Sequence, residues 1–110
     1  MTRLIPALTC VLLAGMPAAA DDQREARAAL EAGKIRPLTE LLARVETDCR
    51  GDMLEVELEE DDDRWSYEIT LVGPHGDVAE LEYDASNLVL LEAEGRDLAA
   101  LQCVPPGTPD

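Results

Sequence analysis

The chain has 110 residues, of which 24 are acidic and 9 are Lys or Arg, and its formal net charge is -15. This length allows one domain with a single thin core and excludes separate substrate and cofactor domains. The acidic balance argues against nucleic acid or an anionic membrane surface as a partner, because phosphate contacts need clustered Lys and Arg. A hydrophobic fraction of 46% predicts a folded chain rather than a disordered one.

The first 20 residues have the order of a secretory signal peptide. A basic start precedes an uncharged apolar stretch at residues 4–16, and three alanines ending at Ala20 form a small-residue cleavage site. The apolar stretch is too short to span a bilayer. We therefore expect a signal peptide at residues 1–20, a periplasmic mature protein and no membrane contact after cleavage, with Cys10 removed alongside the signal.

Two cysteines remain after that cleavage. Cys49 and Cys103 would both enter an oxidising compartment, where paired thiols tend to form a disulfide. A disulfide that closes a loop of about 55 residues contributes roughly 4 kcal/mol of stability in the chain-entropy model. A Cys49–Cys103 disulfide is therefore predicted, and two free thiols are the alternative. No second cysteine pair or histidine cluster accompanies them to suggest a zinc site.

Two helices are expected before residue 50. Acidic residues suit the N-terminus of a first helix at residues 23–32, which Gly33 would end. A second helix should begin at Pro37 and end near Cys49. Its apolar residues recur at helical spacing and should all face one side. These residues are Leu38, Leu41, Leu42 and Val45.

The apolar periodicity then changes from 3.6 to 2, which predicts strands. Four strands are expected near residues 53–60, 64–72, 78–84 and 88–94. Short polar turns between them favour an antiparallel meander, and the alternation leaves one face to be covered. The fold class is therefore α+β, a four-stranded meander packed on one face by the N-terminal helix. The layer facing that helix should contain Leu54, Val56, Leu58, Trp65, Tyr67, Ile69, Leu71, Leu81 and Tyr83.

Several local phrases resemble small exported PepSY-domain proteins. They are Glu25-Ala26-Arg27, the segment 33–38 with Leu41-Leu42, the hairpin segments 54–58 and 65–69, and the strand 76–85 that ends in Asp84-Ala85. The resemblance covers roughly residues 25–94, so the domain is expected at residues 21–98, followed by a flexible tail at 99–110. One departure is the segment Asn87-Leu88, which stands where the family usually has Gly. Asn can adopt the same left-handed conformation.

The resemblance implies a function as well as a fold. PepSY domains occur in propeptides of thermolysin-like proteases, where the domain is thought to inhibit or chaperone its peptidase. The resemblance therefore implies a binding or regulatory role, and the partner is expected to be a periplasmic peptidase or a basic protein. The residues themselves carry no catalytic signature. His75 is the only histidine, it lies in a turn, and no second catalytic group accompanies it. The chain is expected to be no enzyme and to need no cofactor.

Acidic residues are concentrated in one segment. Seven of the nine residues at 55–63 are acids. The strand acids should form a solvated face that meets the partner, and they are Glu55, Glu57, Glu59, Glu68, Glu80 and Glu82. The alternative is weak calcium binding by Glu59, Asp61 and Asp63, although the spacing and central Gly of an EF-hand loop are missing.

Overall fold

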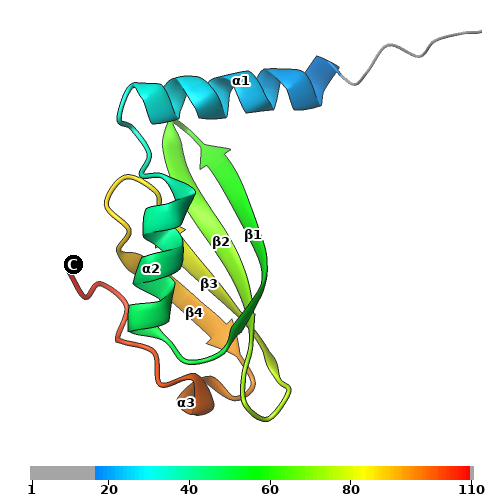
Figure 1. The fold of residues 1–110 in the computed structure, drawn as a ribbon, viewed down its shortest axis with the longest axis vertical. Coiled ribbons are helices and arrows are strands. Elements are labelled where there is room, and N and C mark those ends of the chain that lie inside the picture. The colour runs from blue at the N-terminus through cyan, green and yellow to red at the C-terminus, as the bar shows by residue number, and fades with distance from the viewer. Residues whose placement is uncertain (1–16, 110) are drawn as a thin grey trace, which may run out of the picture.

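The computed structural model describes residues 17–109, and these fold into helices and one sheet (Figure 1). The elements are α1 (Pro17–Glu31), α2 (Leu38–Asp48), β1 (Asp52–Asp61), β2 (Arg64–Val72), β3 (Val78–Asp84), β4 (Leu90–Gly95) and α3 (Leu98–Leu101). This order confirms the predicted α+β class. Most of the expected signal peptide, residues 1–16, lies outside the described residues, and the expected cleavage point after Ala20 falls within α1. Between residues 17 and 109, no helix combines the length and apolar character needed to cross a bilayer.

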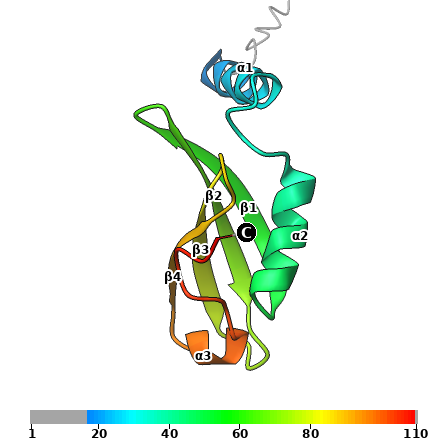
Figure 2. The same cartoon turned by 90° about the vertical axis from the view of Figure 1, so that its left-hand side faces the viewer.

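The sheet is a meander in the order β1-β2-β3-β4, with every neighbouring pair antiparallel. Helix α2 lies across one face, and α1 crosses the end of the sheet near the β1–β2 hairpin (Figures 1 and 2). None of the helices within residues 17–109 covers the opposite face (Figure 2). The β1–β2 connection is the pair Asp62 and Asp63, both with positive φ, which is the two-residue turn that suits the twist of a hairpin. Aspartate tolerates this left-handed conformation better than most residues.

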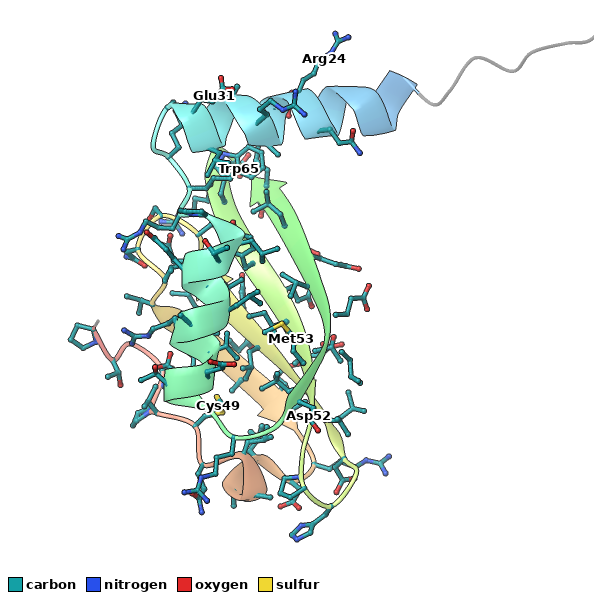
Figure 3. All side chains as sticks on the ribbon, viewed as in Figure 1. Arg24, Glu31, Cys49, Asp52, Met53 and Trp65 are labelled. Carbon is teal, nitrogen blue, oxygen red and sulfur yellow. A yellow bond between two sulfur atoms is a disulfide. The ribbon has the colours of Figure 1, made fainter. Side chains whose placement is uncertain are left out.

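The core lies between α2 and the inner face of the sheet. Leu41 and Val45 point from α2 into it. The sheet supplies the facing layer of Tyr67, Ile69, Leu71, Ala79, Leu81, Tyr83 and Leu90, all of them buried. Val56, Leu58 and Trp65, which were predicted in this layer, are partly buried and pack against it. Trp65 lies at the end of the sheet next to α1 (Figure 3).

Two leucines of α2 were wrongly predicted to be buried. Leu38 is 46% exposed and Leu42 is 37% exposed, whereas Leu41 is fully buried. A helix on a sheet buries only a narrow stripe, and Leu41, Val45 and Asp48 occupy it. At 100° per residue, Leu38 and Leu42 fall together on one flank of that stripe. Helical spacing placed these leucines on the side of α2 that faces the sheet, but they lie at the margin of the buried stripe and not at its centre.

The prediction for Leu54 was also wrong. The register of β1 against β2 shifts between Met53 and Glu55, which is the mark of a β-bulge. Met53 pairs with Leu71 and takes the inward position, and Leu54 is the extra residue, 60% exposed. The alternation of Leu54 with the residues that follow it therefore breaks at the start of the strand.

The left-handed residue after the Asp-Ala turn is Leu88 rather than Asn87. Leu88 has φ 57° and its side chain is buried. The side chain of Asn87 instead accepts a hydrogen bond from the backbone N–H of Val89 (2.9 Å). A leucine in this conformation is strained by roughly 1–2 kcal/mol. Burial of its side chain in the core offsets that cost.

The C-terminal segment is attached to the domain at several points. Cys103 forms the predicted disulfide with Cys49, with 4.1 Å between the Cα atoms. Leu101 is buried, and the N–H of Val104 donates to the carbonyl of Asp48 (2.9 Å). Further along, the N–H of Gly107 donates to the carbonyl oxygen of Leu90 in β4 (2.7 Å). The segment that was predicted to be a flexible tail thus contacts both α2 and β4.

A buried carboxylate connects α2 to the sheet. Asp48 is 4% exposed, and its Oδ2 accepts hydrogen bonds from Arg44 Nε (2.8 Å) and Tyr83 Oη (2.9 Å). Burial and the bond to Asp48 raise the pKa of Tyr83, so its hydroxyl stays protonated and donates. Arg44 also donates to the carbonyl of Thr108 (3.1 Å). The Asp48 carboxylate therefore joins α2 to a central strand, and its partner Arg44 extends the network to the C-terminal segment.

We expect Leu41 and Leu42 of α2 to contribute unequally to the free energy of unfolding, because only Leu41 is fully buried. Leu41→Ala should cost about 2–5 kcal/mol of unfolding free energy, because it leaves a cavity in the core. The matched change Leu42→Ala should cost less than about 1 kcal/mol, as is usual for partly exposed positions. Urea denaturation of the oxidised protein measures both. Equal costs would contradict the placement of α2.

The hydroxyl of Tyr83 should matter more than that of Tyr67. Tyr83→Phe leaves a buried charged acceptor with one partner fewer, so it should cost about 1–3 kcal/mol. Tyr67 donates to the backbone carbonyl of Arg36 (2.7 Å), and Tyr67→Phe should cost about 0.5–1.5 kcal/mol. Denaturation of the two variants in parallel provides the comparison. A smaller cost for Tyr83→Phe than for Tyr67→Phe would contradict the role of Asp48 in holding α2 to the sheet.

Candidate functional site: an acidic sheet face

The register of the strands aligns glutamates in rows across the face opposite α2. One row contains Glu57, Glu68, Glu82 and Glu92, each directly opposite the next. A second row runs from Glu55 through Thr70 to Glu80 and Glu94. In a third row, Glu59 lies opposite Ser66, which lies opposite Asp84. Cross-strand partners share one face of a sheet, so these side chains all point to the same side.

We call this surface the acidic face and define it by Glu55, Glu57, Glu59, Glu68, Glu80, Glu82, Glu92 and Glu94. The structure brings all six residues predicted from the sequence together on it. It adds Glu92 and Glu94 of β4, which were not among the residues predicted from the sequence. Their alternation with Ala93 was the available signal.

Basic residues are nearly absent from the strands. Among the four described strands, Arg64 is the only Lys or Arg, and it lies at the hairpin end opposite Asp61. Arg36 and Arg44 belong to the α2 side, where they pair with Glu40 (2.6 Å) and Asp48. The rows of the acidic face therefore contain no cationic member.

Like charges so close together alter each other's titration. A hydrogen bond with Glu55, and then its charge, raises the pKa of Glu57 above the ordinary value of 4.5. Glu59 raises the pKa of Glu68 in the same way, and Glu94 raises that of Glu92. The folded protein therefore holds protons on this face more tightly than the unfolded chain does.

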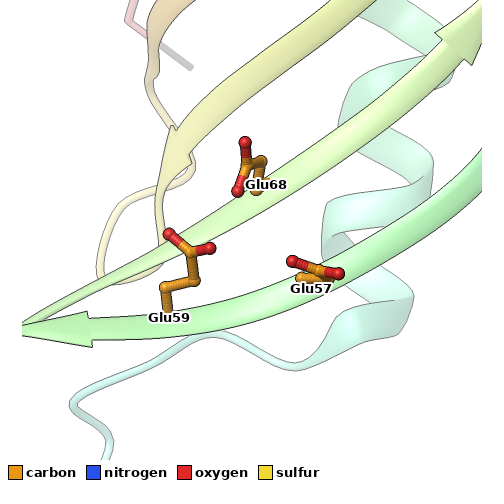
Figure 4. A group of neighbouring side chains, drawn as sticks. All are labelled: Glu57, Glu59 and Glu68. Carbon is orange, nitrogen blue, oxygen red and sulfur yellow. The ribbon is translucent and has the colours of Figure 1, made fainter.

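The closest group of carboxylates lies near the hairpin. One carboxylate oxygen from each of Glu57, Glu59 and Glu68 lies within 4.8 Å of the others. Figure 4 shows these side chains projecting from β1 and β2. The trio suggested by the sequence, Glu59, Asp61 and Asp63, forms no such group in the described part of the chain. Asp61 and Asp63 instead belong to the strand end and the turn.

His75 has a partner that sequence reasoning missed. Its Nδ1 lies 2.8 Å from Oδ2 of Asp97, which is 22 positions away in the chain. That hydrogen bond, and then the charge of Asp97, raises the pKa of His75 above 6.5. His75 lines a surface groove of about 520 Å³ whose lining includes no Ser, Thr or Cys side chain. The groove thus offers a base without a hydroxyl or thiol nucleophile beside it.

Comparisons with known proteins add no further constraint. No family model matches the chain, and neither a curated protein nor a solved structure matches it.

The raised pKa values predict a stability that increases toward acid pH. A carboxyl group with a raised pKa in the folded state binds more protons when folded, so stability falls as pH rises above about 4.5. The melting temperature should therefore rise between about pH 7.5 and about pH 5, and added NaCl should raise it at the higher pH. The pairing of His75 with Asp97 also makes the protein more stable toward acid pH, so a variant is needed that tests the effect of the glutamates alone.

The triple variant Glu57→Gln/Glu68→Gln/Glu92→Gln serves this purpose, because it leaves His75 and Asp97 intact. Its melting temperature should exceed that of the wild type near neutral pH and should depend less on pH. A wild-type melting temperature that stays level or falls toward acid pH would show that the face is not under charge repulsion.

Proposed function

We propose that the protein is a non-enzymatic binding module whose acidic face holds a basic surface of a protein partner. The observation that carries this proposal is the open sheet face with eight glutamates, whose rows contain no cationic residue and end at the single Arg64 by the hairpin. Like charges directly opposite each other destabilise a sheet. A cationic partner would replace that repulsion with attraction and would be steered toward the face from a distance.

The partner class and the compartment are argued from other features of the chain. The order of two helices followed by a meander agrees with what the PepSY resemblance implies, and that resemblance suggests a peptidase that the module inhibits or otherwise regulates. The signal-like first 20 residues and the Cys49–Cys103 disulfide support export to the periplasm. The acidic face itself requires only a basic partner.

The experiment compares two triple variants that remove the same charge. Glu57→Gln/Glu68→Gln/Glu82→Gln alters the acidic face, and Glu25→Gln/Glu31→Gln/Glu46→Gln alters exposed positions on the helices. The probe is a fluorescent ten-residue lysine peptide, titrated by anisotropy at low salt. At about 0.5–1 kcal/mol per lost contact, the face variant should bind roughly tenfold or more weakly. The helix variant should stay close to wild type.

Equal weakening of both variants would mean that net charge alone attracts the peptide, and the proposed site would be wrong. The peptidase role has its own assay, the residual activity of a thermolysin-like peptidase mixed with wild-type protein or with the face variant. Inhibition by the wild type that the face variant loses would support it.

Calcium binding is the second candidate, because three carboxylates converge at Glu57, Glu59 and Glu68. Calcium takes six to eight oxygen ligands, and this trio offers only surface carboxylates. Calorimetry with CaCl₂ distinguishes the candidates. Stoichiometric micromolar binding that disappears in Glu57→Gln/Glu59→Gln/Glu68→Gln would favour a cation-binding protein over a binding module.

A further inference from the structure

Strand β1 leaves a long backbone edge open. It is a ten-residue strand at one end of the sheet, and among the described residues no backbone hydrogen bond joins it to any segment other than β2. The opposite edge strand, β4, has six residues and receives the Gly107 N–H at Leu90. Figure 1 shows β1 at the outer side of the sheet, with no described element other than β2 alongside it. The two edges therefore differ, and only that of β1 is both long and free.

An apolar groove runs beside this edge on the α2 side. It has a volume of about 360 Å³, and its lining includes Leu30 from α1, Leu38 from α2, and Val56 and Leu58 from β1. Leu30 and Leu38 are 43% and 46% exposed. Val56 and Leu58 point toward the core side but are only half-buried, since no strand lies beyond them.

The other side of the same edge is acidic. Glu55, Glu57 and Glu59 alternate with Val56 and Leu58 along β1. A strand that pairs with β1 has side chains that alternate between the same two faces. Every second side chain of such a strand would enter the apolar groove, and those between would lie next to the glutamates.

We propose that the β1 edge binds an extended segment of the partner as a fifth strand, with apolar and basic residues alternating along that segment. This inference rests on the proposed function and adds the position and the sequence pattern of the bound segment. Backbone hydrogen bonds along the edge supply affinity, and the two faces select the side chains. Charge complementarity favours a basic segment over a second copy of this chain, because two β1 strands would set glutamates against glutamates.

The test uses two blocked nine-residue peptides of equal charge, one alternating Lys with Val and one alternating Lys with Ser. Burying apolar side chains in the groove should make the Lys–Val peptide bind at least tenfold more tightly. Leu38→Gln should remove most of that difference. Leu91→Gln is the matched control, since Leu91 is 48% exposed on β4, and it should have no effect. Denaturation curves verify that both variants are folded.

Hydrogen exchange identifies the binding mode directly. Amides of β1 should gain protection when the Lys–Val peptide is bound. If both peptides bind equally, depend on the face glutamates and protect no β1 amide, the edge-strand inference is wrong while the proposed function stands. If neither peptide binds, or if binding ignores the triple substitution of the acidic face, the proposed function is wrong as well.

Discussion

The carboxylate of Asp48 determines where α2 lies, and the rest of the fold depends on that position. A buried charge is tolerated only when it is paired and hydrogen-bonded. Asp48 meets this condition through Arg44 on its own helix and Tyr83 on a central strand. The adjacent residue, Cys49, carries the disulfide. Asp48 therefore holds the end of α2 over β3, and the disulfide ties the same end to the C-terminal segment.

The position of α2 also decides what remains uncovered. Arg44, on one flank of the helix, contacts the C-terminal segment, whereas Leu38, on the other flank, lines the groove beside β1. The acidic face lies on the opposite side of the sheet, which none of the described helices covers. The contacts that stabilise the domain thus lie on the side of the sheet that α2 covers, and the repulsion between glutamates lies on the other side. The domain keeps its charged surface because the carboxylate, the disulfide and the apolar layer all act on the covered side.

Sequence reasoning predicted the features that depend on local periodicity. The helix–helix–meander order, the strand positions to within two residues and the six glutamates on one face all follow from spacings of 2 and 3.6. The disulfide followed from the cysteine count and the expected compartment. Features that depend on neighbours far away in sequence were missed. Predicting the bulge at Leu54 requires the register of β1 against β2. Predicting the partial exposure of Leu38 requires the orientation of α2 on the sheet.

The same limit applies to the polar contacts. Asp48 looked like one more acid in an acidic chain, and only its approach to Tyr83, 35 positions away, shows that it is structural. Asp97 became the partner of His75 because the turn after β2 and the segment after β4 lie at the same end of the meander. For Leu88, the sequence indicated a left-handed residue nearby, but asparagine was the more natural candidate.

The disulfide has a topological consequence. Cys49 and Cys103 are 54 positions apart, and all four strands lie between them, so the sheet belongs to one covalent ring. A peptidase that cut the exposed Asp62–Asp63 turn would open this ring without releasing a fragment. The two pieces would stay joined through the sulfur bridge and aligned by the remaining strand pairs. Releasing any part of the sheet by proteolysis therefore takes two cuts within the ring, or one cut and a reductant.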